Sequence, residues 1–324
     1  MNAIDVKLQP PWPWVSLVGC CTSVLRSRGV KCDFTDVAGM SGYAFLVNTS
    51  VRVGPEGVTS FDWLALQPGL QALGLETEVV FTELGEDPGG PLEEVFERVK
   101  AEVDAGRCPV VWAACGSPEF AVVYGYDGDN YLVRSARSVN WKKPERLLKP
   151  EQELEDPVPH DRLPASGKLG AVFFGDKVEA VPTRTGVQAV VRAAGLLSGR
   201  HAAYWPGFAH GAAAFDAWAD ALCSGEFEPE GNAYNAACYW ELQMFGAGFL
   251  SRLARHSAGA SKELAAAGLE LARSWGNLEQ VKDMFAAGAS PGRDGVEKAE
   301  GMLRDCGQAN RAALAALENA LALL

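Results

Sequence analysis

The hydrophobic pattern of the first half of the chain mixes two periods. Apolar residues recur at helical spacing over Val15–Arg28, which is followed by Gly29, and over Pro91–Gly106. In the second helix, one apolar stripe is formed by Leu92, Val95, Phe96, Val99 and Val103. Runs rich in β-branched and aromatic residues predict strands, namely TEVVFTEL, PVVWAAC, EFAVVYGYD, NYLVRSA and LGAVFFG. A DGDN turn predicts that the third and fourth runs form a hairpin.

The pattern changes at about Thr183, where alanine and glycine become more frequent and strand signals stop. Helical spacing then predicts five helices, Thr185–Ser198, Phe208–Cys223, Ala233–His256, Ser261–Ala286 and Gly295–Leu323. The segment TSFDWLALQPGLQALG in the first half predicts one more helix, with a break near Pro68. We therefore predict two domains, an α+β domain over residues 1–180 and an all-α domain over residues 181–324.

Composition narrows the classes of function. The chain has 324 residues, of which 48% are hydrophobic, and a formal net charge of −12. An acidic chain without a dense Lys/Arg cluster argues against nucleic acid and anionic membranes as partners. The N-terminus lacks the apolar run of a secretory signal, and no stretch is long and apolar enough to span a membrane. We expect a cytoplasmic protein.

Cysteine and histidine usage does not predict a metal or redox site. The eight cysteines are scattered without a CxxC pair, and the four histidines lie far apart. We expect reduced and mostly buried thiols. Neither GxGxxG nor GxxxxGK[ST] occurs in the sequence, so no nucleotide-binding motif is present, and we expect no cofactor.

Two segments carry a family resemblance. SLVGCCTSVLRSRGVKCDFTDVAGMSGYAF and PEFAVVYGYDGDNYLVRS together resemble papain-like domains of the C39 peptidases and of the butirosin biosynthesis protein H-like acyltransferases. In those families a cysteine opens a helix, and a glycine-rich turn follows in the acyltransferases, here Gly39–Phe45. A histidine precedes a strand that ends in Gly-Tyr-Asp, and an acid lies on the next strand. The resemblance covers roughly the first 175 residues and implies a papain-like fold with a central antiparallel sheet.

The resemblance implies that the catalytic positions are replaced. The family nucleophile lies about thirteen residues before the glycine that ends the helix, where backbone N–H groups and the helix dipole stabilise a thiolate. That position is Ser16, whereas Cys20 and Cys21 lie at least one turn farther along. Glu119 stands at the histidine position, and Arg134 or Ser135 at the position of the acid. A serine is harder to deprotonate than a cysteine, and glutamate is a weak base at neutral pH.

Further residues are candidates for ligand binding. Ser41 and Tyr43 belong to the glycine-rich turn, and Tyr204, Trp205 and His210 come at or just before a predicted helix start. Tyr204, Trp205 and His210 could line an interdomain pocket, and ordinary packing at a domain junction is the alternative. Cys21 falls on an apolar helix face and is expected in the core, whereas Cys20 lies on the neighbouring face beside serines.

Three hypotheses follow. The favoured one is a papain-like protein without Cys-His-Asp peptidase activity that binds a small molecule or peptide in an interdomain cleft. The second is an active acyltransferase or amidohydrolase that uses Cys20 with a histidine such as His210. The third is a structural protein that forms a homodimer through its acidic, alanine-rich helices.

Overall fold

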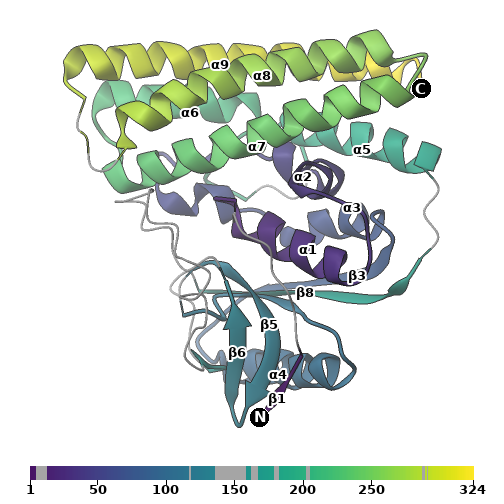
Figure 1. Cartoon of the computed structure of the whole chain (residues 1–324). Coiled ribbons are helices and arrows are strands. Elements are labelled where there is room, and N and C mark those ends of the chain that lie inside the picture. Colours follow the sequence, from purple (N-terminus) through teal and green to yellow (C-terminus); the bar gives the residue numbers. More distant parts are fainter. Residues whose placement is uncertain are drawn as a thin grey trace. The chain divides into compact units, whose positions relative to one another are not determined.

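The structure is a computed structural model of the chain, and it describes residues 1–4, 13–116, 118–135, 158–161, 167–178, 182–201, 205–286, 289 and 291–324 (Figure 1). Contacts divide the chain into two units. The first contains Met1–Val37 and Trp63–Ala180, and the second contains Ala38–Asp62 and Val181–Leu324. Residues 38–62 belong to the second unit, whereas the predicted division into residues 1–180 and 181–324 places them in the first domain.

The first unit contains an antiparallel sheet of seven strands within the described residues, which confirms the α+β class. The strand order is β3-β8-β4-β5-β6-β7, with β1 also pairing with β5. The strands are β1 (Asn2–Ala3), β3 (Leu75–Glu83), β4 (Val110–Trp112), β5 (Phe120–Asp127), β6 (Asn130–Arg134), β7 (Val158–Pro159) and β8 (Lys168–Lys177). Asp127 pairs with Asn130, so the predicted hairpin is confirmed.

Helices cover both faces of this sheet. Helix α1 (Ser16–Ser27) and helix α4 (Gly89–Asp104) lie on opposite faces (Figure 1). The predicted apolar stripe of α4 is buried along its whole length and packs on Val111, Ala121 and Phe173 of the sheet. Successive side chains of the central strands β4, β5 and β8 are therefore buried on both faces, whereas β3 alternates between buried and exposed residues.

Two parts of the first half depart from the predictions. The predicted helix around Pro68 is a 3₁₀ turn, η3 (Trp63–Leu66), followed by the short helix α3 (Gln67–Gln71). Pro68 fits in the first turn of α3, where its missing N–H would have no helical partner. Strand β4 ends at Trp112, three residues before the predicted run ends, because Ala113 adopts a positive φ of 56°.

The second unit is mainly helical (Figure 1). The five predicted helices are confirmed with small shifts at their ends, as α5 (Pro182–Leu197), α6 (Ala212–Ser224), α7 (Pro229–His256), α8 (Ser261–Met284) and α9 (Arg293–Leu321). Helix α8 packs on both α7 and α9, and α6 packs on α9. Strands β2 (Asn48–Thr49) and β9 (Ala209–His210) also pair in this unit. The prediction that strands stop after Thr183 was therefore wrong, because a two-residue strand leaves no periodic signal.

Residues 38–62 are bound to the helices of the second unit by buried hydrogen bonds. The Tyr239 hydroxyl donates to the carbonyl of Asn48 at 2.5 Å and accepts from its N–H at 3.1 Å. The Asn235 amide donates to the Gly54 carbonyl at 2.9 Å. This segment begins in α2 (Phe34–Ser41) and continues through η1 (Tyr43–Phe45) and η2 (Pro55–Thr59).

The predicted glycine-rich turn, Gly39–Phe45, is partly helical. Gly39 lies within α2, and a Cβ there would come within 2.1 Å of the Phe249 ring, so the helix requires a glycine for close packing. The chain turns at Gly42, where φ is +90°, and then enters η1. The turn is therefore shorter than the sequence suggested.

Candidate functional site

Helix α1 begins one residue after the predicted start at Val15. Ser16 is its first residue, and Val15 precedes it with an extended backbone. The helix runs to Ser27, and Gly29 follows with φ +80°, as a glycine beyond a helix C-terminus often does. Cys20 therefore lies in the second turn, where backbone N–H groups already bond within the helix.

Two side chains of α1 bind the same backbone residue. The N–H of Phe120 donates to the Ser16 Oγ at 3.0 Å, and the Cys20 thiol donates to the Phe120 carbonyl at 3.3 Å. Ser16 and Cys20 are one turn apart, so their side chains lie on one face of α1. Together they provide hydrogen-bond partners for the N–H and the carbonyl of Phe120, the first residue of β5, and hold α1 against the sheet.

The electrostatic surroundings of Cys20 disfavour its thiolate. Burial raises the pKa of Cys20 well above its usual value, and electrostatic interactions with Cys21, Cys115 and Glu119 disfavour its thiolate further. A hydrogen bond from the Val122 backbone acts in the opposite direction. The side chain is completely buried. A thiol in this position stays protonated near neutral pH.

Cys21 is completely buried in α1, as the sequence predicted. Burial raises its pKa, and the neighbouring Cys32 raises it further. It therefore behaves as a small apolar residue of the core.

Glu119 lies at the end of a strained loop between β4 and β5. Its side chain is half-buried, and its carbonyl accepts the Ala113 N–H at 2.8 Å. Ala113 has φ +56° and Gly116 has φ +76°. A left-handed non-glycine residue costs about 1–3 kcal/mol and is common near functional sites. The loop brings the residue at the predicted histidine position next to the residues of α1.

The next strand carries no acid at the compared positions. The guanidinium of Arg134 lies over the Tyr124 ring at 5.2 Å from its centroid, and Ser135 is completely buried. Ser16, Cys20 and Glu119 therefore come together in the first unit, and the third position holds an arginine or a serine.

The predicted ligand-binding residues Ser41 and Tyr43 lie in the core of the second unit. Both are almost fully buried. The Ser41 hydroxyl donates to the Ala38 carbonyl at 3.2 Å and accepts from the Tyr43 N–H at 3.3 Å. The Tyr43 hydroxyl donates to the Val58 carbonyl at 3.0 Å. Their polar groups therefore hold the fold of residues 38–62.

Trp205 and His210 are half-buried and close to each other in the second unit. Burial lowers the pKa of His210, and a hydrogen bond with the Trp205 backbone partly offsets that effect. Tyr204 lies outside the described residues. The interdomain pocket that these residues could line stays a prediction.

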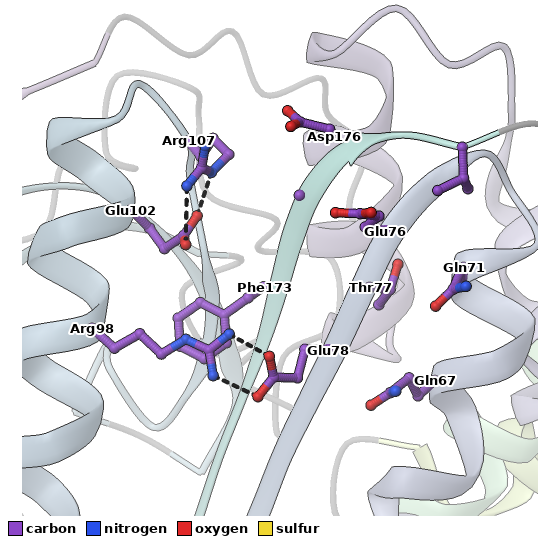
Figure 2. A pocket seen from close by; sticks show the side chains of 12 residues that line it. Gln67, Gln71, Glu76, Thr77, Glu78, Arg98, Glu102, Arg107, Phe173 and Asp176 are labelled. Carbon is purple, nitrogen blue, oxygen red and sulfur yellow. Dashed lines mark hydrogen bonds and ion pairs between the residues drawn. The ribbon is translucent and has the colours of Figure 1, made fainter.

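A polar cavity of about 660 Å³ lies in the first unit (Figure 2). The Arg98 guanidinium makes a fork with the Glu78 carboxylate, at 2.6 and 2.7 Å, and covers the Phe173 ring at 3.9 Å. Arg107 makes a second fork with Glu102, at 2.5 and 3.2 Å. No local sequence pattern indicates this cavity, because its walls come from α3, β3, α4 and β8, which are far apart in sequence and meet only in the fold.

Among the described residues, no three or more His, Cys, Asp or Glu side chains gather in a way that could hold a metal ion. None of the helices in the described part of the chain has the length and apolar character needed to cross a membrane. No protein-family model matches the chain, and no curated protein matches it in sequence.

Proposed function

We propose that this chain is a papain-like-fold protein that has lost Cys-His-Asp peptidase chemistry and binds a small molecule or peptide. The resemblance of the two N-terminal segments supports the fold, and the antiparallel sheet with α1 on one face is compatible with it. The observation that carries the proposal is the attachment of Ser16 and Cys20 to the backbone of Phe120.

This attachment opposes cysteine catalysis for a physical reason. A nucleophilic cysteine needs a lowered pKa and a base within hydrogen-bond reach. The Cys20 thiol instead donates to a carbonyl and is surrounded by groups that raise its pKa. The first turn of α1 carries the Ser16 hydroxyl, which accepts a backbone hydrogen bond. Both side chains thus hold α1 against β5 by hydrogen bonds.

Thiol labelling tests the loss of chemistry. We expect iodoacetamide near neutral pH to modify the exposed Cys223 in the native protein and to leave Cys20 unmodified until urea is added. Mass spectrometry of tryptic peptides measures both sites, and Cys223→Ser identifies the background. Rapid, stoichiometric modification of native Cys20 would overturn the proposal and favour the active acyltransferase or amidohydrolase.

A second experiment tests the assignment of the two positions. In the variant Ser16→Cys with Glu119→His, we expect the new thiol to have a lower pKa than the thiol of Ser27→Cys at the other end of α1. The helix N-terminus and an imidazole both stabilise a thiolate, whereas the C-terminus does not. Ultraviolet thiolate absorbance against pH measures the two values. Equal pKa values would show that Ser16 and Glu119 do not occupy the nucleophile and base positions.

A further inference from the structure

Strand β7 lies at one end of the sheet, and its backbone pairing is short. In the strand order it follows β6. In the part of the sheet that the structure describes, β7 pairs with β6 at two positions, Val158 and Pro159. Proline has no N–H, so Pro159 donates no hydrogen bond to the ladder. The attachment of residues 158–161 therefore depends strongly on side-chain contacts, and His160 supplies them.

The His160 ring is bonded through both of its nitrogens. Its Nδ1 lies 2.9 Å from the carbonyl oxygen of Asp129, which also accepts the backbone N–H of His160 at 3.0 Å. Its Nε2 lies 2.9 Å from the Oε2 of Glu93 on α4. The imidazole is 13% exposed and the Glu93 side chain 57%. The ring therefore connects β7 to the turn between β5 and β6 and to α4.

These two partners determine which form of the ring fits. A carbonyl oxygen can only accept a hydrogen bond, so the Nδ1 of His160 must carry a proton. An ionised carboxylate also only accepts, so the contact with Glu93 is a hydrogen bond only when Nε2 carries a proton as well. Both bonds exist together in the imidazolium alone. In the neutral ring, the lone pair of Nε2 faces the carboxylate, and that contact is repulsive.

Ring stacking favours the same charged form. The His160 ring lies on the ring of Phe96, with the centroids 4.2 Å apart and an angle of 14° between the planes. Phe96 itself is almost fully buried in α4. The face of an aromatic ring attracts a cation. Phe96 therefore stabilises the imidazolium in addition to Glu93.

Other titratable groups come close to His160 or to the Phe96 ring beneath it, namely Lys100, Asp129, Tyr131 and Asp161. Lys100 is paired with Glu97 on the same helix. Burial raises the pKa of Tyr131, so its hydroxyl stays neutral through the range in which a histidine titrates. Asp129 and Asp161 are exposed to solvent. Among the described residues, Glu93 is therefore the carboxylate that is bonded to the ring.

We propose that His160 and Glu93 form a pH-sensitive latch, which holds β7 on the sheet when His160 is protonated and loosens it when His160 is neutral. Histidine side chains change charge between about pH 5 and 8. At the acid end of this range the imidazolium binds Asp129 and Glu93 together. At the alkaline end the bond to Glu93 is lost, and the edge of β6 is covered less firmly.

Hydrogen exchange of the His160 amide tests the latch. This N–H donates to the Asp129 carbonyl, so its protection reports the attachment of β7. NMR measures the exchange rate, which is divided into the rate of an unstructured amide at the same pH to give the protection factor. A partly exposed ion pair has a modest effect, so we expect protection about threefold lower at pH 8 than at pH 5.5. Equal or higher protection at pH 8 would overturn the proposal.

Two variants of α4 identify the group that acts on the ring. In Glu93→Gln the amide can accept from a protonated Nε2 or donate to a neutral one, so protection should be independent of pH. Glu97→Gln is the matched control, because it removes a carboxylate one turn along the helix that pairs with Lys100. It should keep the decrease of the wild type. Circular dichroism confirms that both variants are folded. An unchanged decrease in Glu93→Gln, or its loss in Glu97→Gln, would contradict the assignment of the latch.

Discussion

A serine at a helix start usually caps the helix, but Ser16 does not. The residue before the first helical position has the extended backbone of a cap, and here it is Val15, which has no side-chain donor or acceptor. Ser16 enters the helix and uses its Oγ as an acceptor for the Phe120 N–H. Tertiary contact with β5 therefore overrides the local preference of serine for the cap, and a buried backbone donor gains its partner.

Removing that hydroxyl should destabilise the first unit. In Ser16→Ala the Phe120 N–H stays buried without its acceptor, which costs about 1–3 kcal/mol of unfolding free energy. Urea denaturation measures the change. The control is Ser27→Ala in the same helix, whose Oγ donates only to the Val24 carbonyl and whose loss should cost less than about 0.5 kcal/mol. Equal effects would contradict the role of Ser16.

The buried thiols should make stability fall at alkaline pH. Burial raises the pKa of Cys108 to about 11, compared with 9.0 for a free thiol. Below pH 9 the Cys108 thiol is protonated in both the folded and the unfolded chain, so its full contribution to stability is present. Between pH 9 and 11 the unfolded chain releases the proton and the folded chain keeps it, so stability declines.

Each such thiol contributes a slope of about 1.4 kcal/mol per pH unit in that window. Urea denaturation at a series of pH values should therefore give a shallower decline for Cys108→Ala than for the wild type. Cys223→Ala serves as the control, because Cys223 is exposed. A decline that is the same in all three proteins would show that Cys108 does not contribute.

Packing between elements depends on close approach at one strand of the sheet. Gly170 lies in β8 under the Trp63 ring of η3, where a Cβ would come within 2.3 Å of the ring. Phe81, Trp112 and Phe120 surround Trp63, with ring centroids 4.7–5.2 Å away. Trp63 therefore has little space into which it could move.

Gly170→Ala should accordingly cost about 1–3 kcal/mol of stability through overpacking. Gly90→Ala in α4 is the control in the same unit, because no atom lies within 4 Å of its added Cβ. That change should be neutral or stabilise by up to about 1 kcal/mol, since alanine favours a helix over glycine. Chemical denaturation compares the two, and a tolerated Gly170→Ala would contradict the packing described.

At the scale of the whole molecule, the second unit is built from two separate stretches of chain. Its long helix α7 presents the buried side chains of Tyr239 and Asn235 to residues 38–62. Without that stretch, both polar groups lose their partners, at a cost of about 1–3 kcal/mol each. The unit therefore depends on a segment that precedes most of the first unit in sequence.

Fragments should show this dependence directly. We expect residues 181–324 alone to unfold at lower temperature and less cooperatively than the same residues joined by a flexible linker to residues 38–62. Circular dichroism during heating measures both. The joined fragment with Asn235→Ala is the control, because it loses only the hydrogen bond between Asn235 and the Gly54 carbonyl. Identical melting of the lone and joined fragments would contradict the division into units.

The sequence by itself determined the long helices, the stripe of α4, the β5–β6 hairpin and, to within one residue, the start of α1. These features follow from local periodicity and turn residues, which depend on neighbours within one or two turns of chain. The resemblance of the two N-terminal segments also placed Glu119 at the family's histidine position, which should lie near the first turn of α1.

Only the tertiary structure decided which distant groups meet. Three features join segments far apart in sequence: the pairing of β2 with β9, the hydrogen bonds of Ser16 and Cys20 to the Phe120 backbone, and the polar cavity of Figure 2. A two-residue strand has no period, and an exposed acid on an alternating strand looks the same with or without a cavity beside it. Long-range packing sets such contacts, so no local pattern could reveal them.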